Sequence, residues 1–147
     1  MDKLTDYKNF VKAGKAIFTL ENETTGNRFT YKVKKLKNKD IWFVSVLNGP
    51  DNYHNYNYLG CIFDKTFRST AKSRIGQDAL SFKAFKWLNS IINLNLDKPL
   101  PEGVNVYHEG RCGRCGKRLT VPSSILSGYG PECVKKQNIL LDEHFEI

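Results

Sequence analysis

The sequence predicts an α+β fold, in which an antiparallel β-meander is packed by one amphipathic helix and followed by a small zinc-ribbon or zinc-knuckle module. Three observations support this prediction. Segments of alternating apolar and polar residues fill the first half of the chain, a stretch of helical periodicity follows them, and three cysteines at metal-ligand spacing come last. The length of 147 residues suits one domain with a small appended module.

The first half of the chain is expected to form about four strands. Residues 15–21 and 28–34 alternate apolar with polar side chains on either side of the turn-forming stretch NETTGN, which predicts a hairpin. Residues 41–47, IWFVSVL, are apolar on both faces and rich in strand-forming residues, as in a central strand. Residues 53–63 alternate again. Short turns between such strands produce an antiparallel meander.

One helix is expected to cover the apolar face of this sheet. Apolar residues recur at helical spacing at Leu80, Ala84, Trp87, Leu88 and Ile91, and Phe85 and Ile92 widen this stripe. The helix should occupy about residues 79–95, because the next stretch, LDKPLPEG, contains two prolines that a helix interior does not tolerate. We place a boundary there. It divides the chain into an α+β domain over residues 1–98, a zinc-binding module over residues 104–137 and a tail over residues 138–147.

The expected module carries a metal-binding pattern. Cys112 and Cys115 form a Cys-x-x-Cys pair, each followed by a glycine, and Cys133 comes directly after a Gly-Pro-Glu stretch. Glycine supplies the backbone freedom of the tight turn that directs two sulfur atoms at one ion. Zinc takes four tetrahedral ligands, most often thiolates and imidazoles. We expect one structural Zn²⁺ per chain, because a closed site with four protein ligands leaves no position for a substrate.

The fourth ligand is expected to be His108, which stands at the end of a short predicted strand. His144, Cys61, a water molecule and the absence of any metal are the alternatives. His144 lies close to the C-terminus, and Cys61 belongs to a predicted strand, where a small buried thiol is common. The expected metal ligands are therefore His108, Cys112, Cys115 and Cys133.

Basic residues outnumber acidic residues, 23 against 15, and the net charge is +8. Such an excess favours contact with polyanions, and with nucleic acid first. Two basic stretches stand out, YKVKKLKNKD and the cysteine turn, which would form a phosphate-tracking groove if they shared one face. The residues expected to contact nucleic acid are Lys32, Lys34, Lys35, Lys37, Arg111, Arg114, Lys117 and Arg118. A solvated strand edge that discourages aggregation is the alternative for the lysine run.

Two tyrosines, Tyr56 and Tyr58, are interleaved with asparagines in the last predicted strand. Exposed rings on a sheet can stack single-stranded bases. Packing under the helix is the alternative, and the alternation with Ile62 favours it.

The sequence contains no motif typical of a membrane protein, a secreted protein or an enzyme. No apolar run approaches the roughly 20 residues of a membrane span. The N-terminus has no apolar core of a signal peptide, so we expect a cytoplasmic protein without a membrane partner. No convergent nucleophile and base, paired carboxylates or phosphate-binding glycine loop stands out. We therefore expect a protein that is not an enzyme and has no small-molecule substrate.

Two C-terminal stretches, HEGRCGRCGKRLTVPSSI and SGYGPEC, are supported by the N-terminal stretches AGKAIFTLENETTGNRFTYKV and WFVSVLNGPDNYHNYNYLG. Together they cover most of the chain. On them, the sequence resembles small, mostly uncharacterised proteins of bacteriophages and mobile elements that end in a zinc-ribbon or zinc-knuckle module. The resemblance implies a small zinc-binding protein in the cytoplasm of a bacterial host, and it implies no catalytic residues.

Two functions follow from these patterns. The first is a non-enzymatic protein that binds nucleic acid, with single-stranded DNA or RNA favoured, through a basic surface. The alternative is a protein-interaction module that binds and inhibits or diverts a host enzyme or defence complex. In that case the stretch NYHNYNY would be a contact surface.

Overall fold

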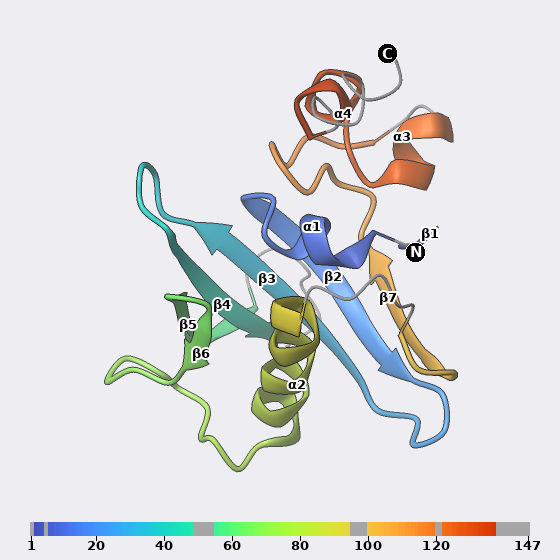
Figure 1. Ribbon diagram of the computed structural model, residues 1–147. Helices are drawn as coiled ribbons and strands as arrows, with labels where there is room; N and C mark the ends of the chain where they lie inside the picture. Colours follow the sequence, from blue (N-terminus) through green and yellow to red (C-terminus); the bar gives the residue numbers. More distant parts are fainter. Residues whose placement is uncertain (1, 5, 49–54, 95–99, 120–121, 138–147) are drawn as a thin grey trace.

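The computed structural model describes residues 2–4, 6–48, 55–94, 100–119 and 122–137. Within these residues, seven strands form one antiparallel sheet in the order β1-β7-β2-β3-β4-β5-β6 (Figure 1). The strands are β1 (Asp2–Lys3), β2 (Lys15–Asn22), β3 (Arg28–Lys35), β4 (Ile41–Leu47), β5 (Tyr56–Phe63), β6 (Thr66–Arg68) and β7 (Val104–His108), and the helices are α1 (Tyr7–Val11), α2 (Leu80–Leu94), α3 (Pro122–Ser127) and α4 (Pro131–Gln137).

The expected α+β class and the antiparallel meander are confirmed. Strands β2 to β6 follow one another in the chain and in the sheet, and β6 adds a short fifth strand to the expected four. The predicted hairpin places Ala16 across from Val33 and Phe18 across from Tyr31. Cross-strand partners project to the same side of a sheet, so these four buried side chains share one face.

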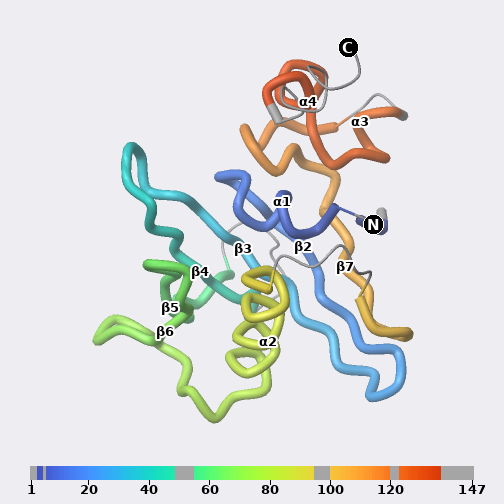
Figure 2. The backbone as a smooth tube through the Cα atoms, viewed as in Figure 1, coloured from blue at the N-terminus to red at the C-terminus, as the bar shows by residue number. Residues whose placement is uncertain are grey.

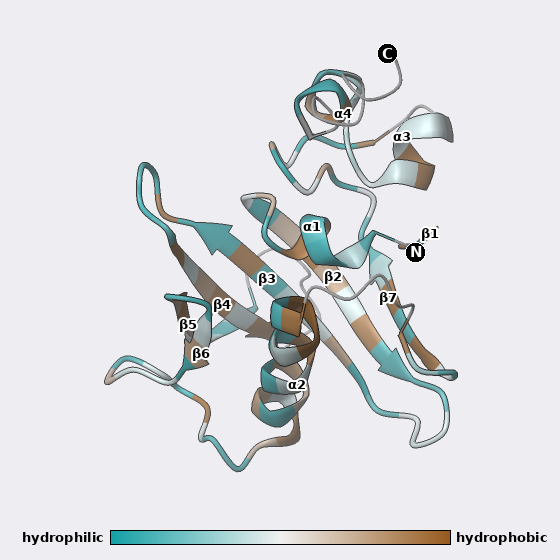
Figure 3. Cartoon of the chain, in the orientation of Figure 1, coloured by the Kyte–Doolittle hydropathy of each residue, from teal (hydrophilic) through white to brown (hydrophobic). Residues whose placement is uncertain are grey.

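Helix α2 covers this face, and its extent agrees with the expected residues 79–95. The Phe85 ring meets the Tyr31 ring edge-on, with centroids 5.2 Å apart, and the Tyr31 hydroxyl donates a 2.7 Å hydrogen bond to the Ser81 carbonyl. Figure 3 shows the apolar colouring of the sheet and helix where they meet. Helix α1 packs on the same side, since the Trp42 indole donates to the Lys12 carbonyl just beyond it.

The buried stripe of α2 agrees in part with the predicted one, since Phe85 and Leu88 belong to both. Phe82, Phe85 and Leu88 are buried, whereas Leu80 and Trp87 are 59% and 36% exposed. The helix is apolar over more than half of its circumference, so periodicity locates the helix but does not choose between two apolar stripes. Ring contacts of Phe82 and Phe85 with the sheet select the first stripe. The second stripe is left to line a surface hollow.

Strand β7 joins the two units that the sequence separates. It pairs with β2 from Phe18–His108 to Asn22–Val104, and β1 pairs with its other edge. Residues on both sides of the expected boundary therefore share one sheet. They also share one hydrophobic core, because Cys112, Leu119 and Tyr129 belong to the same buried cluster as Phe18. The expected tail over residues 138–147 lies outside the described residues.

In the described part of the chain, no helix has the length and apolar character that crossing a membrane requires.

Candidate metal centre and basic sheet face

The cysteine turn begins where β7 ends, and backbone hydrogen bonds shape it. The Cys112 N–H donates to the Lys117 carbonyl at 2.8 Å, and the Gly116 N–H donates to the Cys112 carbonyl at 2.9 Å. Gly116 has φ +81°, a left-handed conformation that glycine adopts without strain. An isolated bridge between Arg111 and Arg118 closes the base of this loop, which we call the knuckle (residues 111–118).

Three sulfur atoms converge at the knuckle. The Sγ atoms of Cys112, Cys115 and Cys133 all lie within 4.8 Å of one another. A zinc–sulfur distance of about 2.3 Å in a tetrahedron separates two sulfur atoms by about 3.8 Å, so small side-chain movements would place all three around one ion. Cys112 and Cys133 are buried and Cys115 is partly buried. The three cysteines can therefore hold one metal ion.

The surroundings of these thiols favour thiolate unequally. Burial raises the pKa of Cys112, but backbone N–H groups of Gly130, Cys115 and Arg114 outweigh burial and lower that pKa overall. The Arg114 and Cys115 N–H groups lie 3.4 and 3.5 Å from its sulfur. Burial raises the pKa of Cys133, although the Arg114 side chain, 3.9 Å from that sulfur, opposes the rise. Thiolate is the form that binds metal, so the surroundings of Cys112 favour metal binding more than those of Cys133 do.

Close packing on α1 fixes the knuckle in place. A Cβ on Gly113 would meet the Phe10 ring at 2.5 Å, and a Cβ on Gly128 would meet it at 3.0 Å. The Gly113 N–H donates to the Gly128 carbonyl at 3.0 Å, which ties the knuckle to the end of α3. Figure 2 shows α1 lying between the sheet and this C-terminal segment. The knuckle and the end of α3 therefore both pack against the Phe10 ring.

The structure does not bring His108 to the three thiols. His108 is fully buried, the Gly110 N–H donates to its Nδ1 at 2.9 Å, and its Nε2 bonds the Ile125 carbonyl. Both ring nitrogens are therefore engaged by backbone groups. The strand register explains the position, because His108 pairs with Phe18 and so projects into the core on the side of α1. The expectation that His108 completes the ligand set has no support in this geometry.

The other candidates for a fourth ligand lie elsewhere. Cys61 is on β5, where it pairs with Phe43 and Arg68 and is absent from the convergent group. His144 lies outside the described residues. Within the residues described, the protein donors that converge are the three thiols alone.

The sheet face opposite α2, which we call the open face, is crossed by rows of basic and aromatic side chains. The first row follows the strand register through Lys15, Lys34, Phe43, Cys61 and Arg68, from β2 to β6. A second row runs through Ile17, Lys32, Ser45 and Tyr58. Figure 3 shows hydrophilic colouring at the end of β3, where the lysines gather.

The two predicted basic stretches meet at the edge of the open face. One surface hollow is lined by Lys15, Ile17, Lys32, Lys34, Arg111 and Gly116, so it combines strand lysines with a knuckle arginine. A neighbouring hollow includes Lys34, Lys35 and Lys37 together with Arg114. Residues about 80 positions apart in the sequence thus form one cationic surface. We call the seven cations that line these two hollows the basic edge. Six of them were predicted, and the seventh is Lys15; the full set is Lys15, Lys32, Lys34, Lys35, Lys37, Arg111 and Arg114.

Not every predicted cation has the same position. Alternation along β3 sends Lys35 toward the helix side, where its ammonium lies 5.7 Å from the Trp42 ring centroid and 3.7 Å from the Asp40 carboxylate. Its long side chain still borders the second hollow. Lys117 and Arg118 are exposed on the knuckle and line neither hollow.

Tyr56 and Tyr58 lie on the open face rather than under the helix. A β-bulge between Val44 and Ser45 shifts the register, so that Gly60 pairs with Val44 whereas Tyr58 pairs with Ser45. The extra residue reverses which side chains face the core on the two sides of the bulge. Ile62 therefore stays buried, as the alternation predicts, while both tyrosines change face.

Several open-face residues were not predicted as functional. Lys15 and Phe43 have no distinguishing local pattern, because Phe43 stands in a run that is apolar on both faces. Lys72 and Arg74 occur in a basic loop and line a hollow with Phe43 and Tyr58. Strand register brings these residues together, and a single sequence does not disclose register across a bulge.

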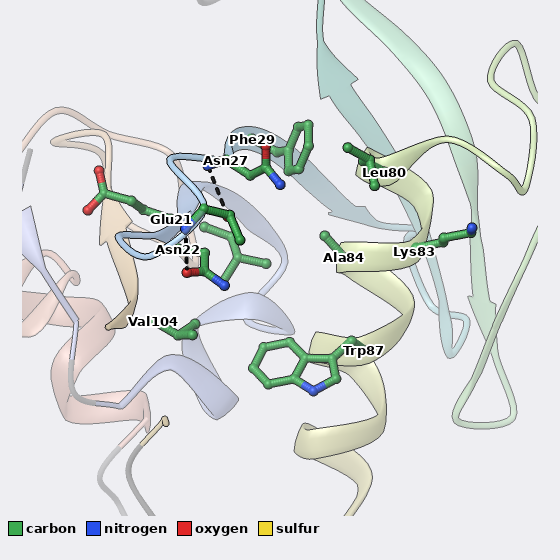
Figure 4. Close-up of a pocket in the computed structure, with 11 residues that line it drawn as sticks. Glu21, Asn22, Asn27, Phe29, Leu80, Lys83, Ala84, Trp87 and Val104 are labelled. Carbon is green, nitrogen blue, oxygen red and sulfur yellow. Dashed lines mark hydrogen bonds between the residues drawn. The ribbon is translucent and has the colours of Figure 1, made fainter. Parts of the chain in front are cut away.

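A separate hollow of about 380 Å³ lies on the helix side, between α2 and the β2–β3 hairpin (Figure 4). Its apolar lining includes Leu20, Phe29, Leu80, Ala84, Trp87 and Val104. Figure 4 shows Trp87 and Val104 facing each other across it, while the Glu21 carboxylate points away. Lys83 supplies a cation at its border.

Comparison with known proteins identifies one similarity. Residues 105–138, about a quarter of the chain, match the profile of DUF6011, a family of unknown function. The matched segment contains the whole knuckle and all three converging cysteines. No curated protein and no solved structure matches the chain. The similarity therefore falls on the candidate metal centre and leaves most of the sheet outside it.

Proposed function

We propose that this protein binds one Zn²⁺ through Cys112, Cys115 and Cys133 and binds single-stranded nucleic acid through the open face and the basic edge. The main support for nucleic-acid binding is that Lys32, Lys34 and Arg111 line the same surface hollow. On this proposal the protein is non-enzymatic. Its resemblance to bacteriophage and mobile-element proteins supports a bacterial host cytoplasm as its place of action.

The proposed zinc ion has a structural role. Three thiolates suit Zn²⁺ among the common cellular ions, and the ion supplies a cross-link between the knuckle and α4. That cross-link orients Arg111 and Arg114, which sit beside the ligands in sequence. Structural zinc contributes on the order of 10 kcal/mol to small modules of this kind, so the knuckle depends on it more than the sheet does.

Electrostatics supports the nucleic-acid part of the proposal. The chain carries a net charge of +8, and the basic edge concentrates part of that excess within reach of one bound strand. Neutralising phosphates releases condensed counterions, which makes such binding favourable at low salt and weak at high salt. The exposed rings among these cations favour a single strand over a duplex, because unpaired bases offer faces for stacking.

A direct test measures the binding of fluorescent oligonucleotides, single-stranded and duplex, DNA and RNA, by anisotropy at about 50 mM salt. The double variant Lys32→Ser/Lys34→Ser should lose at least tenfold in affinity. The matched control Lys83→Ser/Lys86→Ser removes the same charge from exposed positions on α2 and should bind like the wild type. Equal losses in both variants would mean that net charge, and not the open face, determines binding.

The helix-side hollow favours a second candidate function, contact with a host protein. Leu80 and Trp87 expose apolar surface beside a concave site, which is typical of the anchor pockets in protein interfaces. The stretch NYHNYNY that the sequence suggests for this purpose lies partly outside the described residues. A nuclease-treated pull-down with the wild type and Trp87→Ala separates the two functions. A specific partner lost only by Trp87→Ala would favour the protein-interaction function.

A further inference from the structure

We propose that Phe43 and Tyr58 form a stacking site for one base of a bound single strand, and that Lys72 and Arg74 hold a neighbouring phosphate. The four residues line one hollow on the open face. This inference rests on the proposed nucleic-acid function, and it specifies where a base is held and why a single strand is preferred.

Phe43 exposes an aromatic ring on a central strand of the sheet. It stands on β4 in the middle of the meander, and it is 39% exposed although its strand neighbours Val44 and Val46 are buried. Its ring meets Tyr58 in an edge-to-face arrangement, with centroids 6.1 Å apart and an interplanar angle of 61°. An edge-to-face pair covers only part of each ring, so aromatic surface remains for a base.

Backbone hydrogen bonds hold the loop that carries Lys72 and Arg74 beside Tyr58. The Arg74 N–H donates to the Tyr58 carbonyl at 2.9 Å, which attaches the loop that carries Lys72 to β5. Within that loop the Thr70 N–H donates to the Ser73 hydroxyl at 2.9 Å. A hydrogen bond of 3.4 Å also joins the hydroxyls of Thr70 and Tyr58. The position of the loop beside the rings is therefore built into the fold.

The site is continuous with the basic edge. Lys34 lies directly across from Phe43, and Lys15 lies directly across from Lys34. Adjacent strands are about 4.8 Å apart, so a strand of nucleic acid that stacks on Phe43 reaches Lys15 after roughly 10 Å. Cations thus flank the ring on both sides, with Lys72 and Arg74 beyond Tyr58.

Phe43 is a better stacking platform than the other exposed ring nearby. Phe63 is 50% exposed, but the Arg68 guanidinium lies 6.0 Å from its ring centroid and occupies its face. Among the described residues, the cation–ring contacts involve Trp42, Tyr56 and Phe63 and leave Phe43 out. The exposed face of the Phe43 ring is therefore open to a base.

The test compares three probes that share phosphate charge and differ in bases: a dT15 oligonucleotide, an abasic oligonucleotide of equal length and inorganic polyphosphate. The variant Phe43→Ala should bind dT15 at least fivefold more weakly, since one base stack is worth about 1–3 kcal/mol. Its affinity for the abasic and polyphosphate probes should stay within twofold of the wild type. The rU15 probe should behave like dT15, because stacking does not read the sugar.

Three further variants guard against misfolding and general surface effects. Phe43→Leu retains apolar volume without an aromatic face, so it should also bind dT15 more weakly while its affinity for the other two probes stays unchanged. Phe43→Trp keeps an aromatic face and should bind dT15 as tightly as the wild type does. Trp87→Ala removes a ring of similar exposure, 36%, from the helix side and should leave all probes unaffected. No loss for dT15, or an equal loss for all three probes, would overturn the stacking site. Wild-type protein that binds none of the probes would instead contradict the proposed function itself.

Discussion

Replacement of His108 by alanine separates a structural histidine from a metal ligand. The imidazole is fully buried and accepts from the Gly110 N–H while its other nitrogen bonds the Ile125 carbonyl. We therefore expect His108→Ala to lower the stability of the fold strongly and to leave the metal stoichiometry unchanged. The ring also packs near Phe10, with centroids 6.2 Å apart, so its removal opens a cavity beside the Phe10 ring.

The magnitude follows from the contacts that disappear. Leaving the partly buried Gly110 N–H and Ile125 carbonyl without partners costs up to about 1–3 kcal/mol each, and the cavity adds to that cost. A total of about 3–5 kcal/mol is expected. For a chain of this size, about 3 kcal/mol corresponds to a fall of roughly 10 °C in the unfolding temperature.

The assay combines thermal unfolding with metal analysis of protein prepared in the presence of Zn²⁺. His108→Ala should melt at a clearly lower temperature and retain the same number of zinc ions per chain as the wild type. Cys133→Ser is the matched comparison, and it should lose zinc because it removes a converging sulfur. Loss of zinc from His108→Ala with little change in melting temperature would refute the reasoning and restore His108 as a ligand.

Three further outcomes are expected. Gly113→Ala should destabilise the protein by about 1–3 kcal/mol in chemical denaturation, because its Cβ would meet the Phe10 ring at 2.5 Å; wild-type stability would contradict that contact. Tyr31→Phe should cost about 1–3 kcal/mol in the same assay, since the buried Ser81 carbonyl loses its 2.7 Å partner. Burial raises the pKa of this phenol, so the loss should be equal at pH 6 and pH 9. Chelation of the metal should accelerate amide hydrogen exchange in residues 109–137 and leave β3 and β4 protected; uniform acceleration would show that the ion supports the whole sheet.

Periodicity and turn residues were sufficient for much of the fold. The β2–β3 hairpin, the central strand β4 and the extent of α2 follow from local patterns that a chain of this kind displays without any partner strand. Burial selects one face of each strand, so alternation such as Ala16, Phe18 and Leu20 identifies the core directly. The convergence of Cys112, Cys115 and Cys133 likewise follows from ligand spacing.

Features set by the register between paired strands could not be predicted. The bulge beside Val44 turns Tyr56 and Tyr58 to the open face, and nothing in the alternation of β5 marks it. Gly60, the residue that pairs with Val44, is the one local sign, since a Cβ there would collide with the Arg68 carbonyl. A close backbone approach of this kind is visible only once the neighbouring strand is placed.

The position of His108 shows the same limit. Its spacing from the cysteines suits a ligand, but the pairing of β7 with β2 directs the imidazole into the core. Strand β7 enters the sheet after a separation of more than 80 residues from its partner, and two prolines before it favoured a boundary instead. Long-range pairing overrides the local signal in both cases.

The salt dependence of oligonucleotide binding tests the central proposal most directly. Six cations of the basic edge, Lys15, Lys32, Lys34, Lys37, Arg111 and Arg114, would give a slope of about −4 for log affinity against log salt concentration on a single strand. Lys32→Ser/Lys34→Ser should reduce the slope to about −3, while Lys83→Ser/Lys86→Ser should leave it unchanged. A flat dependence for the wild type, or the same slope in all three proteins, would contradict binding through this surface.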